Sequence, residues 1–273
     1  MIYEKCDVSF HPSGLVINGS ADIVYHDDHP VKELCKKFYG DDAAYVIVSD
    51  PPYGNIVDDP WDHWKGDDTS FAGWLFSCFE GWSRWLPDGG AMYVWGGLGS
   101  KGFRPFPKFI DLIEKFTDLT CHNQIVWSKR RAYGVSHNYL FTRQELAYFV
   151  KGDPKHPRVF NIPLLDKLRG YEGFDPEHPA KSEYYRRTNV WTDFNEIFQG
   201  KVHKAQKPDK AYEIPISASS NVDDVIVDPF GGSGVAGWVA TGMDRRFLIV
   251  EKDPVSWNAI CQRVGPQLGV LSV

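Results

Sequence analysis

Residues 43–54 read Ala-Ala-Tyr-Val-Ile-Val-Ser-Asp-Pro-Pro-Tyr-Gly. The apolar, β-branched run that ends at Val48 is typical of a strand buried in a parallel sheet. Pro51 and Pro52 end this strand, because proline cannot donate to a sheet ladder. The stretch therefore predicts a carboxylate, Asp50, at the carboxyl end of a strand, which is the edge where ligands bind in open α/β sheets.

The turn that follows combines one hydrogen-bond acceptor with one aromatic ring. The prolines restrict the backbone of the turn, and Pro51 also restricts Asp50 before it. This frame suits a planar ring that carries an amino group: the amino hydrogens would go to Asp50 and to a turn carbonyl, and the ring would stack on Tyr53. An ordinary turn at the end of a strand is the alternative.

The size and composition of the chain suit one large α/β domain with a small insertion, since it has 273 residues of which 42% are hydrophobic. No apolar run reaches the roughly 18 residues of a membrane span, and the first residues do not form a secretory signal. The five cysteines are far apart and form no Cys-x-x-Cys pair, which argues for reduced thiols and against a zinc site. We therefore expect a cytoplasmic protein with no metal and no membrane contact.

Charge is distributed unevenly along the chain. The net charge is -6, yet residues 129–210 hold 16 Lys+Arg against 10 Asp+Glu, a local surplus of positive charge. A basic footprint for nucleic acid on an otherwise acidic protein would give this asymmetry. A solvated, charged insertion would give it equally.

Apolar runs and helical stripes predict the remaining elements. The expected strands are 15–19, 43–48, 91–95, 121–128, 146–151, 224–228 and 247–251, and the expected helices are 31–39, 71–86, 106–116, 209–218, 234–241 and 254–264. Strands that alternate with helices indicate an α/β fold with a doubly wound, mostly parallel sheet. A basic, aromatic loop is expected between 128 and 146. From 152 to about 200 the pattern breaks, which indicates a loop-rich insertion.

A second turn, residues 228–234, reads Asp-Pro-Phe-Gly-Gly-Ser-Gly and joins a strand to a helix. Its glycines allow the backbone to approach a ligand closely. Glu251 ends the next strand, where an acidic group would bind ribose hydroxyls. Taken alone, this turn also allows a nicotinamide or flavin dinucleotide.

A polar cluster, residues 203–208, reads His-Lys-Ala-Gln-Lys-Pro and leads into a helix shortly before the second turn. Its cations could meet a carboxylate. A solvated helix start is the alternative.

Together these motifs resemble the β group of the DNA amino-methyltransferases, S-adenosylmethionine-dependent enzymes that methylate exocyclic amines of bases. The order of proline turn, insertion and glycine turn is that of the β group, whose sheet is circularly permuted relative to other methyltransferases. The resemblance covers nearly the whole chain. Two positions depart from it: Ser20 follows Gly19 where an Asp is common, and Lys204 stands where proline is common.

The resemblance implies a Rossmann-like methyltransferase sheet in three parts. Residues 1–151 would form the catalytic half, 152–200 an inserted target-recognition element, and 201–273 the cofactor-binding half. The resemblance assigns catalysis to Asp50, Pro51, Pro52 and Tyr53. It assigns S-adenosylmethionine binding to Asp228, Phe230, Gly232, Ser233, Gly234, Glu251, His203, Gln206 and Lys207.

The implied reaction is methylation of the N6 amine of an adenine that is flipped out of double-stranded DNA. An aspartate at position 50 favours adenine, since cytosine enzymes of this type more often carry serine there. DNA contacts are expected from Lys129, Arg130, Arg131, Arg143, Arg186, Arg187 and Trp61, although a solvated surface would explain each cation as well.

Three other functions are compatible with the sequence: methylation of cytosine N4, methylation of RNA or of a protein amide, and DNA binding without activity. A second copy of the chain and a cognate restriction endonuclease are candidate partners.

Overall fold

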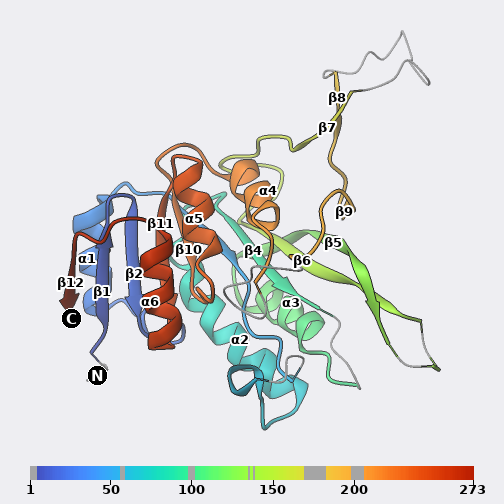
Figure 1. The fold of residues 1–273 in the computed structure, drawn as a ribbon, viewed down its shortest axis with the longest axis horizontal. Coiled ribbons are helices and arrows are strands. Elements are labelled where there is room, and N and C mark those ends of the chain that lie inside the picture. Colours follow the sequence, from blue (N-terminus) through green and yellow to red (C-terminus); the bar gives the residue numbers. More distant parts are fainter. Residues whose placement is uncertain are drawn as a thin grey trace.

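The computed structural model describes residues 5–55, 59–97, 102–134, 136–137, 139–168, 183–197 and 206–273. Within these residues, one large sheet is covered by helices on both faces, and two pairs of strands project from it (Figure 1). No helix in this described part of the chain is both long and apolar enough to cross a membrane.

The strands of the sheets are short except for one pair. Their bounds are β1 Asp7–His11, β2 Gly14–Asn18, β3 Tyr45–Ser49, β4 Ala91–Gly96, β5 Leu119–Tyr133, β6 Phe141–Lys151, β7 Leu164–Leu168, β8 Tyr184–Arg186, β9 Val190–Trp191, β10 Val225–Asp228, β11 Arg246–Glu251 and β12 Gly269–Ser272.

The large sheet has the order β12-β1-β2-β11-β10-β3-β4-β6-β5-β9. The central strands β2, β11, β10, β3 and β4 run parallel to one another. Antiparallel pairs flank this centre, with β12, β1 and β2 on one side and β4, β6 and β5 on the other. The predicted α/β sheet is confirmed, and its parallel part is the centre.

Helices pack on both faces of this sheet. On one face lie α1 (Pro30–Tyr39), α2 (Asp68–Ser83) and α3 (Pro105–Phe116); on the other lie α4 (Lys210–Ser219), α5 (Val235–Gly242) and α6 (Pro254–Arg263). The side chains of each strand alternate between the two cores: Ile47 of β3 belongs to the first, and Val46 and Val48 to the second.

The strands β3 and β10 are neighbours whose following helices lie on opposite faces. The chain leaves β3 through α2 and returns in β4, and it leaves β10 through α5 and returns in β11 on the other side. Such a reversal leaves a crevice at the carboxyl ends of the two strands, where ligands bind in open α/β sheets. The two turns singled out in the sequence, 50–53 and 228–234, follow these two strands directly, at the place where such a crevice is expected.

The prediction of a basic loop between 128 and 146 is wrong, because most of these residues lie in two paired strands. Strands β5 and β6 continue past the end of β4 and pair with each other, so Lys129, Arg130, Arg131 and Arg143 lie on a β-hairpin. The apolar pattern ends where the core ends, and a hairpin without a buried face has no hydrophobic periodicity to reveal it.

Other differences lie at the edges. Strands β1 and β12 were not among the expected elements, and they form an antiparallel edge on which β12 is exposed. Three short strands, β7, β8 and β9, lie within the expected loop-rich insertion. The division of the chain at 151 and 200 stays a prediction.

Candidate active site

A short hydrogen bond joins the two turns of the crevice. The Ser49 hydroxyl, at the end of β3, donates to Asp228 Oδ1, at the end of β10, over 2.6 Å. The same oxygen accepts the Phe230 N–H at 3.1 Å. Both Ser49 and Asp228 are fully buried, so this contact fixes the spacing of the two turns from within the sheet.

The first turn is also held from outside, by a residue that the sequence analysis did not place in the site. Asp62 Oδ1 accepts the N–H groups of Tyr53 and Gly54 at 2.7 and 2.8 Å. Asp62 ends a short 3-10 helix, η1 (Pro60–Asp62), and is almost completely buried. The available signal was its place in an Asp-rich loop just after a proline turn whose N–H groups needed an acceptor.

Gly54 could not carry a side chain. Its φ is +71°, and a Cβ there would lie 2.8 Å from the Phe103 ring. The turn therefore closes against the loop that precedes α3.

Three side chains form a closed triangle at the catalytic turn. Asp50 Oδ2 pairs with the Lys207 ammonium at 2.5 Å, and Asp50 Oδ1 accepts the Tyr53 hydroxyl at 2.7 Å. Lys207 also donates to the Tyr53 hydroxyl at 2.9 Å. The structure thus brings Lys207, which was assigned to the cofactor, onto the predicted catalytic carboxylate.

The Lys207 ammonium is enclosed by aromatic rings. It lies 4.9 Å from the centroid of Trp95 and 5.3 Å from that of Tyr53, and its side chain is only 4% exposed. Burial lowers the pKa of Lys207, and the Asp50 carboxylate opposes this shift. A buried cation of this kind is stable only beside a carboxylate and ring faces that replace its water.

The second turn leaves a backbone cradle. Gly232 has a φ of +51°, and a Cβ there would have no described protein atom closer than 3.9 Å, so the position faces open space. Gly234 has a φ of +73° and stands before the first residue of α5. Glu251 holds the cradle from β11, with Oε2 accepting the Gly232 N–H at 2.7 Å and Oε1 accepting the Asp253 N–H at 2.8 Å.

A buried acceptor next to this cradle is unsatisfied. Asp228 Oδ2 has no hydrogen-bond partner among the described residues. Burial raises the pKa of Asp228 to about 8 and also raises the pKa of Glu251. An open glycine turn, an orphaned carboxyl oxygen and a second carboxyl group fit a ligand that brings polar hydrogens, as an amino group and ribose hydroxyls do.

The other residues assigned to the cofactor have different surroundings. Ser233 is buried in the turn, and the Phe230 ring packs against Trp74 and Phe79 of α2, with both pairs of centroids 5.8 Å apart. Gln206 lies next to Lys207. His203 lies outside the described residues.

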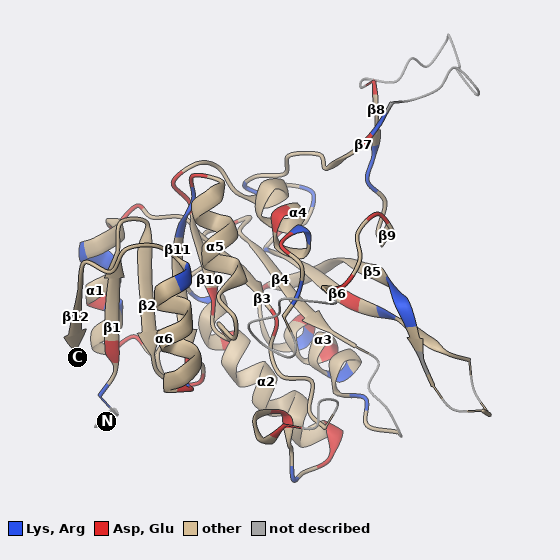
Figure 2. Ribbon diagram, in the orientation of Figure 1, with Lys and Arg blue, Asp and Glu red and all other residues tan. Residues whose placement is uncertain are grey.

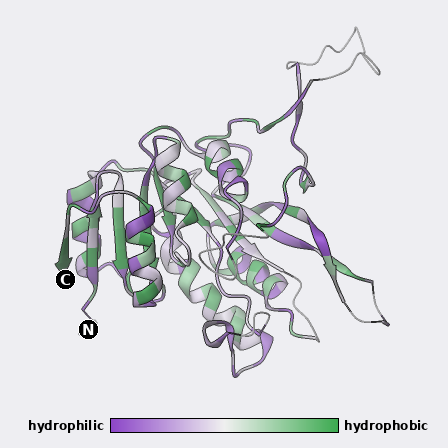
Figure 3. Cartoon of the chain, viewed as in Figure 1, coloured by the Kyte–Doolittle hydropathy of each residue, from purple (hydrophilic) through white to green (hydrophobic). Residues whose placement is uncertain are grey.

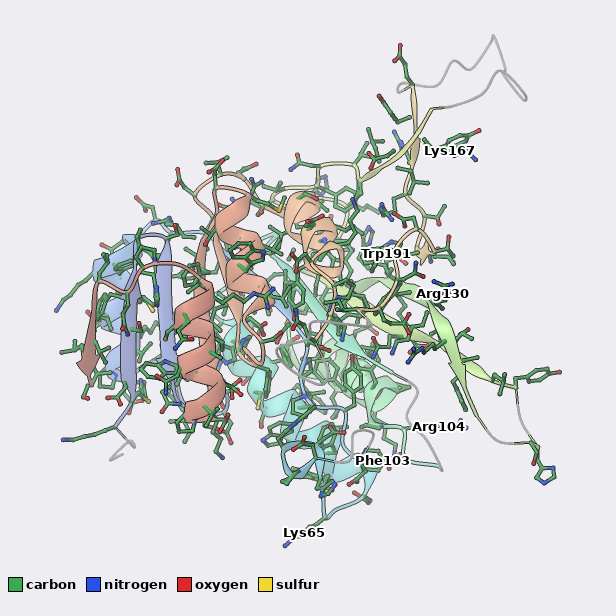
Figure 4. All side chains as sticks on the ribbon, viewed as in Figure 1. Lys65, Phe103, Arg104, Arg130, Lys167 and Trp191 are labelled. Atoms are coloured by element: carbon green, nitrogen blue, oxygen red, sulfur yellow. The ribbon has the colours of Figure 1, made fainter. Side chains whose placement is uncertain are left out.

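The residues expected to contact DNA are not brought into one patch. Arg186 is exposed on β8, whereas Lys129, Arg130, Arg131 and Arg143 lie on the β5–β6 hairpin. Figure 4 shows Arg130 on this hairpin. Trp61 is 41% exposed beside Asp62, at the mouth of the first turn.

Arg187 is different from the other cations. Its side chain is only 5% exposed, and its guanidinium pairs with Asp193 through two contacts, one of them 2.8 Å long. This arginine therefore stabilises the segment between residues 187 and 193.

Residues 44–260 match the profile of a family described as DNA methylase, of N6 and N4 type. The type II methyltransferase M.HpaI of Haemophilus parainfluenzae is 28% identical over 222 residues, 73% of this chain and 61% of that protein. The DNA adenine methyltransferase YhdJ of Escherichia coli (strain K12) is 28% identical over 226 residues, 77% of this chain and 72% of that protein. The chain thus spans about three fifths of the length of M.HpaI.

Two solved structures share the fold. The M1.HpyAVI–SAM complex has a TM-score of 0.61 at 19% identity, covering 92% of this chain and 98% of that one. The PvuII DNA methyltransferase, described as cytosine-N4-specific, has a TM-score of 0.64 at 14% identity, covering 93% and 87%. At these identities the likeness is one of fold.

We expect Asp62→Ala to destabilise the chain by ~1–3 kcal/mol, because two turn N–H groups lose their acceptor. Asp62→Asn should lose much less, since its side-chain carbonyl can still accept both hydrogen bonds. Urea denaturation of the two variants and the wild type measures the difference. Equal losses in both variants would show that the charge of Asp62, and not its hydrogen bonds, stabilises the turn.

The raised pKa of Asp228 predicts a dependence of stability on pH. The folded chain keeps a proton on Asp228 up to about pH 8, whereas an unfolded aspartate releases it above the ordinary value of 3.8. The free energy of unfolding should therefore fall as pH rises through this window, because the folded state binds more protons.

Asp228→Asn cannot titrate, so its stability relative to the wild type should rise from about pH 5 to about pH 8. Denaturation of both proteins at the two pH values measures this, with the exposed Asp42→Asn as the control. A difference that stays constant would contradict the raised pKa.

Proposed function

The chain belongs to the DNA methylase family of N6 and N4 methyltransferases, and on that premise we propose that it transfers a methyl group from S-adenosylmethionine to the N6 amine of adenine in double-stranded DNA. One observation supports this above all: the Asp50 turn and the Asp228 turn meet at the switch point of the sheet, joined by the Ser49–Asp228 hydrogen bond. An acceptor for an amine and a cradle for a nucleoside thus face one crevice.

The second turn would hold S-adenosylmethionine, which supplies an electrophilic methyl group when bound. The open cradle at Gly232 would receive the cofactor, and Glu251 would accept from ribose hydroxyls through lone pairs that the two backbone N–H groups leave unused. Asp228 Oδ2 is a further acceptor or, when protonated, a donor for the polar end of the cofactor.

The first turn would activate the target amine. The lone pair of an exocyclic amine is delocalised into the ring, so the nitrogen is a weak nucleophile. Asp50 and the Pro51 carbonyl would accept hydrogen bonds from its two N–H groups. These hydrogen bonds would direct the nitrogen lone pair toward the methyl group. The Asp50 carboxylate would also stabilise the positive charge that develops on the nitrogen.

Lys207 would have to give up its contact with Asp50 when the target amine binds. Its ammonium occupies Asp50 Oδ2, the oxygen that the amine would use, while Tyr53 occupies Oδ1. We propose that the amine replaces the ammonium at Oδ2. Until then the buried Lys207 ammonium and the partly buried Asp50 carboxylate balance each other's charge.

Tyr53 would support the flipped base. Stacking on an aromatic ring replaces part of what the base loses on leaving the duplex, ~1–3 kcal/mol per base. The Tyr53 hydroxyl is fixed by Asp50 and Lys207, so the ring is held in one orientation. Trp61, exposed beside the turn, is the second aromatic side chain that could border the base.

Adenine is favoured over cytosine by the aspartate at position 50 and by YhdJ, whose name specifies adenine. The PvuII enzyme is cytosine-specific and shares the fold, so the fold does not choose the base. Cytosine N4-methylation is therefore the second candidate.

The proposed DNA contacts lie mainly on the β5–β6 hairpin, where Figure 2 shows a block of Lys and Arg. Arg130 and Arg131 are exposed there, whereas Arg187 is buried with Asp193. We also propose that the chain acts in the cytoplasm, where thiols are kept reduced. Pairing with a second copy of the chain or with a cognate endonuclease stays a proposal that follows from the family resemblance alone.

Methyl transfer from labelled S-adenosylmethionine to unmethylated genomic DNA, followed by nucleoside analysis, tests the function. We expect the label in N6-methyladenine. Label in N4-methylcytosine would keep the mechanism and change the base, and absence of label from DNA would overturn the proposal.

Two variants should separate the roles of the turns. Asp50→Ala should abolish transfer while cofactor affinity stays within a few-fold of the wild type, because Asp50 acts on the amine. Gly232→Val should abolish cofactor binding, because its side chain would fill the cradle. Calorimetric titration with S-adenosylhomocysteine measures the affinities, and equal loss in both variants would mean that Asp50 is structural.

Replacing Arg130 and Arg131 by Gln should weaken DNA binding and flatten its salt dependence. The slope of log K against log salt should decrease in magnitude by about 0.9 for each phosphate that the variant no longer neutralises. The matched control replaces Lys36 and Lys37 of α1, two exposed cations at the opposite end of the molecule (Figure 1). An unchanged slope would remove the hairpin from the DNA footprint.

A further inference from the structure

The β5–β6 hairpin projects from the same edge of the sheet as the catalytic turn. β3 and β4 are parallel, β6 is antiparallel to β4, and β5 is antiparallel to β6. The carboxyl end of β5 therefore points the same way as the carboxyl end of β3, where Asp50 lies. The hairpin and Asp50 therefore lie at the same edge of the sheet.

The hairpin extends well beyond the rest of the sheet. The last position of β4, Gly96, pairs with Glu145, and Glu145 pairs with Val126. β9 pairs only with Val126 and Trp127. Beyond Ser128 the register is irregular. Ser128 pairs with Arg143 and Tyr133 pairs with Phe141, so the ribbon advances by two residues of β6, ~7 Å at the rise of a β-strand, while β5 bulges.

The hairpin is rich in cations, and two carboxylates border it: Glu145 pairs with Arg143 at 3.1 Å, and Glu196 accepts the Arg130 N–H at 3.0 Å. No acidic residue occurs between Asp118 and Glu145, whereas Lys129, Arg130, Arg131 and Arg143 all lie on the part beyond β4. A cationic stem suits the phosphates of a DNA duplex that lies against it.

The far end of the ribbon is apolar. Tyr139, Leu140 and Phe141 follow one another there and are 93%, 60% and 43% exposed. Figure 3 shows this change from a hydrophilic stem to hydrophobic residues farther out. A compact chain would gain nothing from exposing three large apolar side chains in a row, so the segment is suited to a surface that covers it.

We propose that the segment Tyr139–Phe141 is a wedge that inserts into the stacked bases of the DNA duplex next to the target adenine. This inference rests on the proposed function. Proteins that deform DNA insert Phe, Leu and similar side chains between base steps, and unstacking a step costs a few kcal/mol. A target base must be unstacked before it can reach Asp50, and an apolar wedge fills the space that it leaves.

The segment and the catalytic turn divide the work of base flipping. The wedge opens the duplex, the cationic stem holds the backbone, and the Tyr53 ring receives the base at the end of β3. Because β5 and β6 are also strands of the main sheet, the base of the hairpin is fixed relative to β3 and Asp50.

The test compares a paired target with a mispaired one. The methylated sequence is first mapped on plasmid DNA with the wild-type chain, and two duplexes are then made, one with the target adenine paired with thymine and one with it opposite an abasic site. The tip variant carries Leu140→Ser and Phe141→Ser. The control variant carries Val270→Ser and Leu271→Ser, two apolar residues similarly exposed on β12 at the other edge of the sheet.

We expect the tip variant to lose about 10- to 100-fold in kcat/KM on the paired duplex, since a missing few kcal/mol of opening energy has this size. On the abasic duplex, where the target is already unpaired, it should be within about threefold of the wild type. The β12 variant should match the wild type on both. The stem variant, Arg130→Gln with Arg131→Gln, should lose affinity on both duplexes alike.

Equal loss of the tip variant on both duplexes, or no loss on either, would overturn the wedge. A second measurement is independent of turnover: 2-aminopurine in place of the target adenine should brighten with the wild-type chain and much less with the tip variant. Equal brightening would also overturn the proposal. Failure of the proposed function is distinguishable, because the wild type would then transfer no methyl group to either duplex.

Discussion

The Ser49–Asp228 hydrogen bond is the contact on which the architecture of the site depends. It joins the ends of two neighbouring parallel strands whose helices lie on opposite faces of the sheet. The ladder between β3 and β10 pairs Ile47 with Val227, and the Ser49–Asp228 hydrogen bond extends this connection to the residues that lead into the two turns. The distance between the proposed amine acceptor and the proposed cofactor cradle is therefore a property of the sheet core, which is the most rigid part of such a fold.

The same contact places two carboxyl groups, Asp50 and Asp228, near each other at this edge of the sheet. The two groups have different hydrogen-bond and ion-pair partners. Asp50 has a cation, Lys207, and a hydroxyl, Tyr53, as partners. Asp228 accepts from neutral donors, and its raised pKa follows from burial. A paired carboxylate and an acid near neutrality are suited to different tasks, activation of an amine in the first case and recognition of polar hydrogens in the second.

The sequence predicted the fold and both turns because proline and glycine mark strand ends unambiguously, and because 3.6-residue and apolar patterns survive wherever a face is buried. Asp62 was not predicted because its role depends on a loop that folds back onto the turn, and the Asp-rich composition of that loop does not indicate which carboxylate makes the contact. The position of Lys207 beside Tyr53 and Asp50 depends on chain segments about 154 residues apart. The length of β5 and β6 escaped because a ribbon that buries neither face carries no periodic signal.

The hairpin that continues two strands of the sheet also constrains how such a chain can change. Side chains alternate across a ribbon with a period of two, so insertion of one residue in each strand would turn every following side chain to the opposite face. The regularly paired part of the hairpin, up to Ser128 and Arg143, keeps its faces when it is lengthened by two residues in each strand, about 7 Å at a time. The distance from the end of β4 to the end of the hairpin can therefore change in fixed increments, and each increment preserves which side chains face the DNA.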